Sequence, residues 1–255
     1  MTYPKFLKVI KLDICDSTNS FLKKDYIKLQ NEFPALITTK EQTEGRGRET
    51  RKWFSEKNKG LYSSFAFFIK NKKNLNLLSL VTGITVSEIL NKISNKDFKI
   101  KWPNDILYKS KKIAGILIEN IIFEKNIVCI VGIGINLNHE QIDFTDELKE
   151  YAISLKMVTG KSYDVEKINV RLSRLFFKWL YRLEKNKKEI IIQRYNKLCF
   201  YPKGKKISFH HNKKIIQGIY KGIDKEGGLI LEQGNGIESI FFSGEICTNL
   251  PLVFI

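Results

Sequence analysis

The stretch Glu-Gly-Arg-Gly-Arg-Glu-Thr-Arg-Lys-Trp, residues 44–53, is the most informative part of this 255-residue sequence. It places three arginines, Arg46, Arg48 and Arg51, between two glycines and a tryptophan. Arginine side chains bind phosphate and carboxylate groups through charge-assisted, often bidentate, hydrogen bonds. So dense a positive loop repels itself when empty, and we expect it to be mobile alone and to close over an anion. For the loop by itself, a solvated basic loop or a nucleic-acid patch is the alternative.

The composition restricts the partners of this chain. Lysine and arginine number 44 against 27 acidic residues, a net charge of +17 that suits an acidic partner such as a nucleotide or nucleic acid. The lysines are dispersed through nearly every segment, and no helix-turn-helix-like segment, zinc finger or RNP-type motif accompanies them, so we expect no DNA or RNA partner. The longest apolar run, residues 127–135, is too short to span a bilayer, and the N-terminus lacks a signal-peptide core. We expect a soluble, cytoplasmic protein without a membrane partner.

The cysteines and histidines predict no metal centre. The four cysteines lie far apart without a C-x-x-C pair, and the three histidines do not complete a ligand set with them. We therefore expect reduced thiols and no protein-bound metal. The sequence also has no Walker loop and no Ser-x-x-Lys or Gly-x-Ser-x-Gly nucleophile motif, so a bound nucleotide would be held by the arginine loop.

Hydrophobic patterning predicts strands and helices mixed along most of the chain. Strands are expected over residues 7–12, 35–39, 61–69, 98–102, 113–123 and 127–137. Helices are expected over residues 21–29, 75–93 and 163–199, the last with an apolar stripe typical of a core-facing helix. Near residue 200 the pattern changes to short strands alternating with glycine turns, which is typical of a small β-barrel of SH3-like size. We expect two domains, residues 1–200 and 201–255.

Polar residues follow the first strand and precede the arginine loop. Ser17, Thr18 and Asn19 stand at a strand-to-helix junction, where a helix cap is the simplest explanation. Their hydroxyls and amide also offer donors and acceptors to a small polar ligand, and Gln42 leads directly into residues 44–53. Both interpretations stay open at this point.

Two further motifs combine charge with small residues. The segment Lys101-Trp102-Pro103-Asn104-Asp105 contains a proline, which predicts a rigid turn that holds a lysine, an amide and a carboxylate. Lys112 then begins an apolar strand that contains Gly115, so something is expected to approach its backbone closely. In Gly132-Ile133-Gly134-Ile135-Asn136, two glycines interrupt a buried strand, which indicates either room for a ligand or a β-bulge.

These motifs, taken in order, resemble the biotin–protein ligases (biotin–[acetyl-CoA-carboxylase] ligases). The resemblance extends over most of residues 13–136, and Gly222-Ile223-Asp224 and Gly244-Glu245-Ile246 carry it into the C-terminal part. It implies an α+β fold, with a mixed β-sheet flanked by helices and an SH3-like β-barrel at the C-terminal end. It also implies two reactions. Biotin and ATP, with Mg²⁺, give biotinyl-5′-AMP and pyrophosphate, and a lysine of a biotin carboxyl carrier protein domain of a carboxylase then takes the biotinyl group.

The resemblance also implies roles for individual residues. Lys112, Arg48 and Arg51 would be catalytic, and Asp105 would orient or deprotonate the acceptor lysine. Biotin would be bound by Ser17, Thr18, Asn19, Gln42, Arg46, Gly47, Arg48, Lys112, Gly115, Trp53, Leu117 and Gly134. The nucleotide would be bound by Arg46, Arg48, Arg51, Trp53, Lys101, Asn104, Lys112 and Asn136.

Two departures and two rival functions accompany the resemblance. The first strand begins within a dozen residues, which leaves no room for the DNA-binding domain of the regulatory ligases, so we expect no repressor function. Phe241-Phe242 stands where a tryptophan-containing segment is expected, which leaves the contribution of the C-terminal domain open.

A lipoate–protein ligase or octanoyl transferase is the rival enzyme, and a ligand-sensing nucleic-acid-binding protein is the rival of another class. The family commonly pairs through its sheet, so a homodimer is a further alternative.

Overall fold

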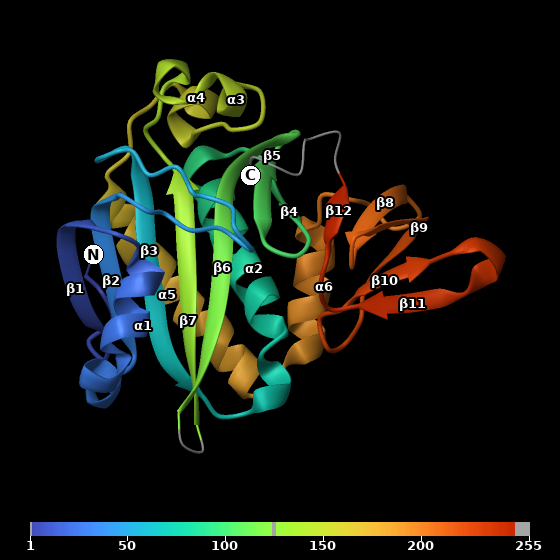
Figure 1. Cartoon of the computed structure of the whole chain (residues 1–255), viewed down its shortest axis with the longest axis horizontal. Coiled ribbons are helices and arrows are strands. Elements are labelled where there is room, and N and C mark those ends of the chain that lie inside the picture. The colour runs from blue at the N-terminus through green and yellow to red at the C-terminus, as the bar shows by residue number, and fades with distance from the viewer. Residues whose placement is uncertain (1, 124–125, 248–255) are drawn as a thin grey trace.

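The computed structural model describes residues 2–123 and 126–247 and contains two β-sheets (Figure 1). The larger sheet has seven strands in the order β1-β2-β3-β7-β6-β5-β4. β1 and β2 are parallel and the other neighbouring strands are antiparallel, which confirms the expected mixed sheet. Its strands are β1 (Lys8–Cys15), β2 (Ala35–Gln42), β3 (Gly60–Ile69), β4 (Phe98–Lys101), β5 (Asp105–Tyr108), β6 (Lys111–Phe123) and β7 (Asn126–Asn136).

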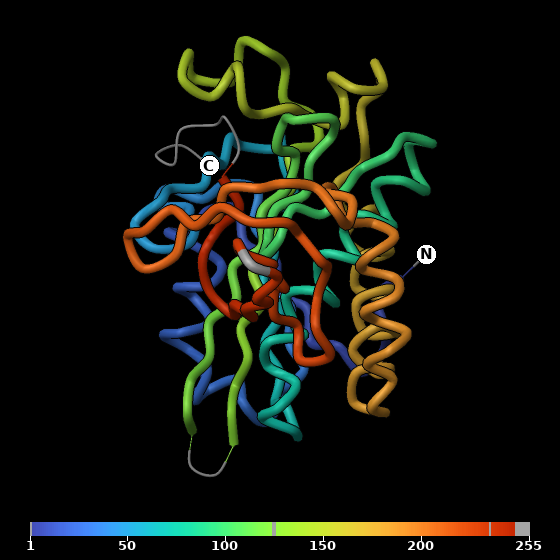
Figure 2. Tube along the Cα trace, turned by 90° about the vertical axis from the view of Figure 1, so that its right-hand side faces the viewer, coloured from blue at the N-terminus to red at the C-terminus, as the bar shows by residue number. Residues whose placement is uncertain are grey.

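Helices cover both faces of this sheet (Figures 1 and 2). α1 (Thr18–Leu29) lies on one face and buries Leu22 against Ile37 and Ile130. The other face packs against α2 (Leu77–Ser94), α5 (Val165–Glu184) and α6 (Lys188–Leu198), which enclose the main hydrophobic core. Two short helices, α3 (Asp146–Lys149) and α4 (Leu155–Thr159), follow β7 beyond the end of the sheet.

α2 is the one described helix that is long and apolar enough to cross a membrane by length and composition. However, 67% of it is buried inside the protein, where it contacts α5, α6 and the sheet. Because its apolar surface is covered by the chain itself, α2 is a helix of the hydrophobic core.

The second sheet has five antiparallel strands in the order β11-β10-β9-β8-β12. They are β8 (Lys206–His211), β9 (Lys214–Ile223), β10 (Leu229–Glu232), β11 (Glu238–Phe241) and β12 (Glu245–Cys247). Buried residues of this sheet, among them Phe209 and Tyr220, belong to the same hydrophobic cluster as the core of the larger sheet. The indole nitrogen of Trp102 also donates to the carbonyl of Gly227 at 3.3 Å. The two sheets are therefore packed directly against each other.

Several elements differ from the sequence-based expectation, among them the short helices α3 and α4, which were not expected. The helical segment expected over residues 163–199 is two helices, α5 and α6, because the polar stretch between them turns the chain at Asn186, whose φ is 55°. The apolar stripe of α5 is buried as expected, with Leu172, Phe176 and Leu183 fully covered. The strand β5 was not expected, because its four residues directly follow the proline turn and are too few to show a period.

Candidate functional site

The floor of the site lies on three adjacent strands and contains three glycines. On the face that carries α1, Gly132 of β7 lies between Ser64 of β3 and Leu117 of β6. In the next row, Gly134 lies between Tyr62 and Gly115. The β6–β7 register runs through both glycines of β7 without a shift, so the bulge alternative is wrong and the glycines provide space.

That space is occupied by side chains of the protein itself. A Cβ atom added to Gly134 would collide with the indole of Trp53, and one added to Gly115 would lie 2.9 Å from the same ring. A Cβ atom added to Gly132 would collide with the amide of Asn19. The glycines therefore allow the tryptophan of the arginine loop and an asparagine of α1 to lie flat on the sheet.

The arginine loop is a hydrogen-bonded hairpin. The amide of Trp53 donates to the carbonyl of Gly45, and that of Gly47 donates to the carbonyl of Arg51, both at 2.8 Å. The amide of Arg51 closes the tip by donating to the carbonyl of Arg48 at 3.1 Å. This geometry turns the arginines toward the sheet, with Trp53 at the base of the hairpin.

Each arginine of the hairpin has an acceptor elsewhere in the chain. The guanidinium of Arg46 contacts both carboxylate oxygens of Glu119, at 3.2 and 3.3 Å. Arg48 donates to the side chain of Asn104 and to the carbonyl of Gly244. The repulsion expected among the arginines is therefore compensated in this structure, because carboxylate, amide and carbonyl oxygens of the chain accept their hydrogen bonds.

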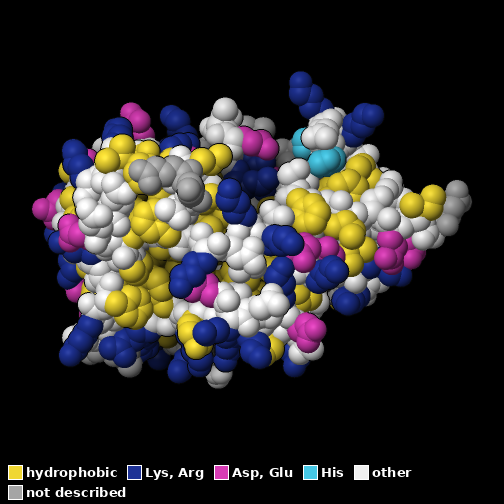
Figure 3. All heavy atoms as spheres, turned by 90° about the horizontal axis from the view of Figure 1, so that it is seen from below, with side chains coloured by type: hydrophobic (Ala, Val, Ile, Leu, Met, Phe, Trp, Pro, Cys, Tyr) yellow, Lys and Arg dark blue, Asp and Glu magenta, His cyan; other side chains and the backbone are white. Residues whose placement is uncertain are grey.

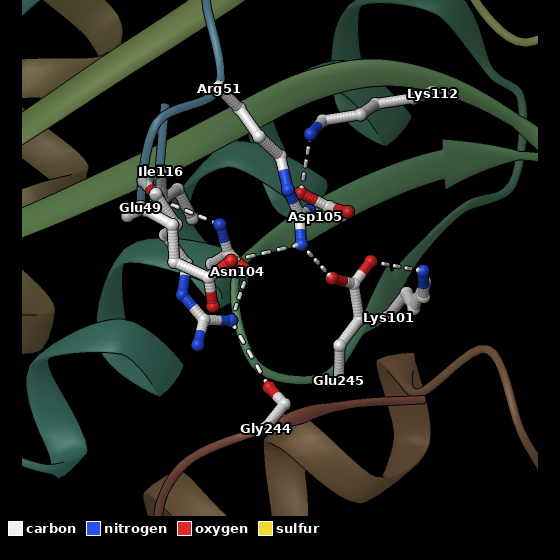
Figure 4. Close-up of polar contacts among 10 residues, drawn as sticks. Glu49, Arg51, Lys101, Asn104, Asp105, Lys112, Ile116, Gly244 and Glu245 are labelled. Carbon is white, nitrogen blue, oxygen red and sulfur yellow. Dashed lines mark hydrogen bonds and ion pairs between the residues drawn. The ribbon is translucent and has the colours of Figure 1, made fainter. Parts of the chain in front are cut away.

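The third arginine joins the second sheet to the site. Arg51 lies 2.6 Å from one oxygen of Glu245 in β12, and Lys101 lies 3.1 Å from the other (Figure 4). Burial alone would raise the pKa of Glu245, but the charge of Lys101 and the hydrogen bond from Arg51 hold it below its usual value. Glu245 was not a candidate from the sequence, although it stands in the Gly244-Glu245-Ile246 motif.

Lys112 and Asp105 form a buried ion pair beside the hairpin. Their Nζ and Oδ1 atoms are 2.8 Å apart, and both side chains are 6% exposed (Figure 4). Burial lowers the pKa of Lys112, and the neighbouring charge of Asp105 opposes that shift. The ammonium also lies 5.5 Å from the centre of the Trp53 ring, within cation–π range. Asp105 thus contacts the expected catalytic lysine.

The polar cluster at the start of α1 is held by Gln42. The Gln42 side-chain oxygen accepts from the backbone amide of Thr18 at 2.9 Å and from its hydroxyl at 3.2 Å, and its nitrogen donates to Ser55. Ser17 occupies the N-cap position but makes no side-chain capping hydrogen bond. Gln42 therefore takes over the capping role, and the Ser17 side chain lines the cavity above the sheet.

Two adjoining cavities collect most of the expected site residues. The smaller, of about 40 Å³, is lined by all twelve residues expected to bind biotin. Arg51 and Asn104 also line it, whereas Asn136 lines the larger groove of about 820 Å³. Neither cavity includes Lys101 or Asp105 in its lining, so the structure places these two behind Glu245 and Lys112 rather than on the cavity surface.

Several lining residues were not candidates from the sequence. Lys52 lines both cavities, and Phe54, Phe144 and Tyr151 line the larger groove. The buried ring of His139 supports this wall, because it stacks on Phe144 with centroids 5.1 Å apart. For Lys52 and Phe54 the position beside the arginine motif was a usable signal, whereas the 139–152 segment carried no recognisable motif.

Among residues 2–123 and 126–247, no group of three or more His, Cys, Asp or Glu side chains is arranged to hold a metal ion. Basic side chains are spread over the face seen in Figure 3, with acidic and hydrophobic ones among them.

Comparisons with known proteins agree on one family. Residues 12–138 match the Biotin/lipoate A/B protein ligase family, and residues 204–246 match the Biotin protein ligase C terminal domain. The bifunctional ligase/repressor BirA of Escherichia coli is 33% identical over 240 residues, covering 93% of this chain and 73% of that protein. BirA of Bacillus subtilis is 32% identical over 215 residues, and the match spans 81% of this chain and 64% of the relative.

Solved structures give the same result. The biotin protein ligase from Aquifex aeolicus, in complex with biotin and ATP, superposes with a TM-score of 0.79 at 31% identity. The match covers 94% of this chain and 97% of that one, so it includes both sheets. With its glycine floor, arginine hairpin and second sheet, the chain belongs to the biotin protein ligase family.

Proposed function

We propose that this protein is an ATP-dependent biotin–protein ligase. The observation that carries the proposal is one cavity in which a polar end, formed by Ser17, Thr18 and Gln42, accompanies three arginines and two lysines. The polar end suits a small uncharged ring system that needs donors and acceptors, and the cationic end suits a carboxylate and phosphates. The Aquifex relative was crystallised with biotin and ATP, which together have these groups.

The first reaction needs the positive charge that the hairpin supplies. The carboxylate of biotin attacks the α-phosphorus of ATP, a C–O–P linkage forms, and pyrophosphate leaves. Two anions do not approach each other without compensation, so Arg46, Arg48, Arg51 and Lys112 would stabilise the charge that develops in the transition state. We propose that Mg²⁺ enters bound to the triphosphate, whose oxygens are the ligands that it prefers.

The two cavities suggest where the substrates bind. We assign biotin to the small cavity over Gly115 and Gly134, and the nucleotide to the larger groove lined by Asn136. At about 40 Å³ the small cavity has room for a few waters, at roughly 10–15 Å³ each. Biotin is much larger, so the indole of Trp53 must leave the glycine floor before it enters.

The second reaction needs a neutral amine on the acceptor protein. We propose that the ε-amine of a lysine on a biotin carboxyl carrier protein domain attacks the acyl carbon of biotinyl-5′-AMP. A C–N bond forms between the lysine and the biotinyl group, and AMP leaves. The unperturbed pKa of a lysine is about 10.4, so an acceptor for its proton assists the step. In the present geometry the charges of Asp105 and Lys112 neutralise each other. Asp105 can accept this proton once Lys112 has turned to the nucleotide phosphates.

The remaining assignments follow from the same proposal. We propose that residues 1–200 form the catalytic domain and residues 201–255 a second domain, of which residues 248–255 lie outside the described part. We also propose a cytoplasmic location, where a carrier domain would be encountered. A homodimer stays a prediction.

The decisive experiment supplies the purified protein with ATP, Mg²⁺, biotin and a carrier domain, and measures the mass of the carrier. We expect one added biotinyl group, and none without ATP or with Lys112→Met. A parallel reaction with lipoate in place of biotin tests the rival enzyme. Transfer of lipoyl without transfer of biotin to any carrier would overturn the proposal.

A further inference from the structure

The carboxylate of Glu119 connects α1, β6 and the arginine hairpin. Glu119 follows Gly115 and Leu117 on the same face of β6, beyond the end of β5, and its side chain is 16% exposed. Its Oε2 atom accepts from the Asn19 amide at 2.9 Å and its Oε1 atom accepts from Lys23 at 2.9 Å. Arg46 adds its fork to both oxygens. Donors from three different side chains therefore meet on one carboxylate.

This contact fixes the orientation of the Asn19 amide. The nitrogen of that amide faces Glu119 and the carbonyl oxygen of Leu117, whereas its oxygen lies 2.6 Å from the hydroxyl of Ser64. The same hydroxyl lies 2.6 Å from that of Thr18. Asn19 and Thr18 both line the small cavity, whereas Glu119 does not. The hydrogen-bond donors and acceptors that face the cavity therefore depend on the carboxylate of Glu119, which lies outside it.

Glu119 differs from an ordinary surface ion-pair partner. Exposed pairs contribute on the order of 0–1 kcal/mol, and Lys23 and Arg46 are each about 40% exposed. Glu119 itself is mostly covered and accepts a bidentate arginine, the arrangement with the strongest geometric specificity. Burial would raise its pKa, but the hydrogen bonds from Asn19 and Lys23 and the charge of Arg46 hold the pKa below its usual value.

We propose that Glu119 is a positioning residue for the biotin end of the site, and this rests on the proposed ligase function. It acts through two partners, holding Arg46 over the cavity and orienting Asn19 within it. Loss of its charge would release Arg46 from the α1 side of the site, whereas Arg48 and Arg51 would keep their contacts with Asn104, Gly244 and Glu245. The affinity for biotin and the retention of the adenylate would fall, while the chemistry at Lys112 would change little.

The test compares Glu119→Gln with Lys23→Met in an assay of biotin-dependent pyrophosphate release. The neutral amide offers one acceptor oxygen, and its NH₂ group turns donors toward Lys23 and Arg46. We expect KM for biotin to rise about 10-fold, the loss typical of a charge-assisted hydrogen bond, with kcat within about 3-fold of wild type. Lys23→Met should leave KM unchanged, because it removes the partner that does not line the cavity.

A double variant identifies the path of the effect. If Glu119 acts largely through Arg46, Glu119→Gln combined with Arg46→Met should lie within about 2-fold of Arg46→Met alone. Circular dichroism and thermal unfolding verify that each variant is folded. A wild-type KM in Glu119→Gln would overturn the inference, as would an equal rise in Lys23→Met, which would reduce Glu119 to an anchor for α1. Failure of the wild-type protein to form biotinyl-AMP would count against the proposed function instead.

Discussion

The Nη2 atom of Arg51 lies 2.6 Å from the Oε2 atom of Glu245, so an ion pair joins the arginine hairpin to the last described strand of the second sheet. Lys101, whose side chain is 2% exposed, shares the same carboxylate. Because the neighbouring Gly244 carbonyl accepts from Arg48, two of the three hairpin arginines depend on β12 and its preceding residue. The second sheet thus contributes directly to the geometry of the site.

Glu245→Gln should destabilise the protein and loosen the hairpin. Removing one partner of a buried ion pair leaves the charge of Lys101 uncompensated, at a cost of about 3 kcal/mol. We expect a matching fall in the free energy of unfolding by urea and faster trypsin cleavage after Arg48 and Arg51. Glu238→Gln, at an exposed position of β11, is the control. Wild-type stability together with wild-type cleavage would show that the pair does not hold the loop.

Lys112→Met should abolish adenylate formation. The ammonium is placed to stabilise negative charge on the phosphates, and loss of one such donor costs about 10²–10³ in kcat. Pyrophosphate release in single-turnover conditions measures this step without a carrier. Lys109→Met removes an equal charge from an exposed position and should retain full activity. Wild-type pyrophosphate release by the Lys112 variant would remove this residue from the mechanism.

Gly134→Ala should impair biotin binding more than folding. The added methyl group would stand on the floor of the small cavity, in the space that the indole of Trp53 occupies now and that biotin would take once the indole has moved away. Overpacking of this kind costs about 1–3 kcal/mol, or roughly a 5- to 150-fold loss of affinity if the strain falls on the bound state. Calorimetric titration with biotin measures it. Gly234→Ala is the matched control, since nothing lies within 4 Å of its added Cβ, and unchanged affinity at position 134 would argue against biotin lying there.

His139 should make stability depend on pH. Burial lowers its pKa from 6.5 to about 4, so between these values the unfolded chain binds a proton that the folded chain does not. The free energy of unfolding therefore rises with pH through this window and falls on acidification. Acidification from about pH 7.5 to pH 5 lowers the free energy of unfolding by about 2 kcal/mol through this histidine.

His139→Phe isolates that contribution. The phenyl ring can keep the stacking on Phe144 but cannot take up a proton. We expect the unfolding free energy of wild type minus that of the variant to fall by about 2 kcal/mol as the pH falls across that range. Urea denaturation at the two pH values gives this difference. A difference that stays constant would mean that the imidazole is protonated equally in both states.

Contiguous motifs made much of the site predictable from the sequence. Arg46, Arg48 and Trp53 stand within one short segment, and the glycines of β7 stand two residues apart on one face, so local spacing already indicates which side chains share a cavity. The central strands were also predictable, because their buried β-branched and aromatic runs are long enough to show a pattern. Single residues that act through distant partners were not predictable in this way.

Glu119 and Glu245 illustrate the limit. Neither local sequence indicates an arginine partner, and the role of each glutamate arises only when the fold brings an arginine from 73 or 194 positions away. The break between α5 and α6 was hidden by apolar spacing that continues on both sides of Asn186. The position of Trp53 on the glycine floor could not be predicted from the sequence either, because the same glycines are compatible with a bound ligand.

The ion pair between Arg51 and Glu245 has a consequence for biosynthesis. During translation the hairpin leaves the ribosome 194 residues before its acidic partner. Until β12 emerges, the nascent hairpin lacks its two most distant anchors, Gly244 and Glu245. The contacts of Arg48 and Arg51 with the second sheet can therefore form only after almost the whole chain has been synthesised.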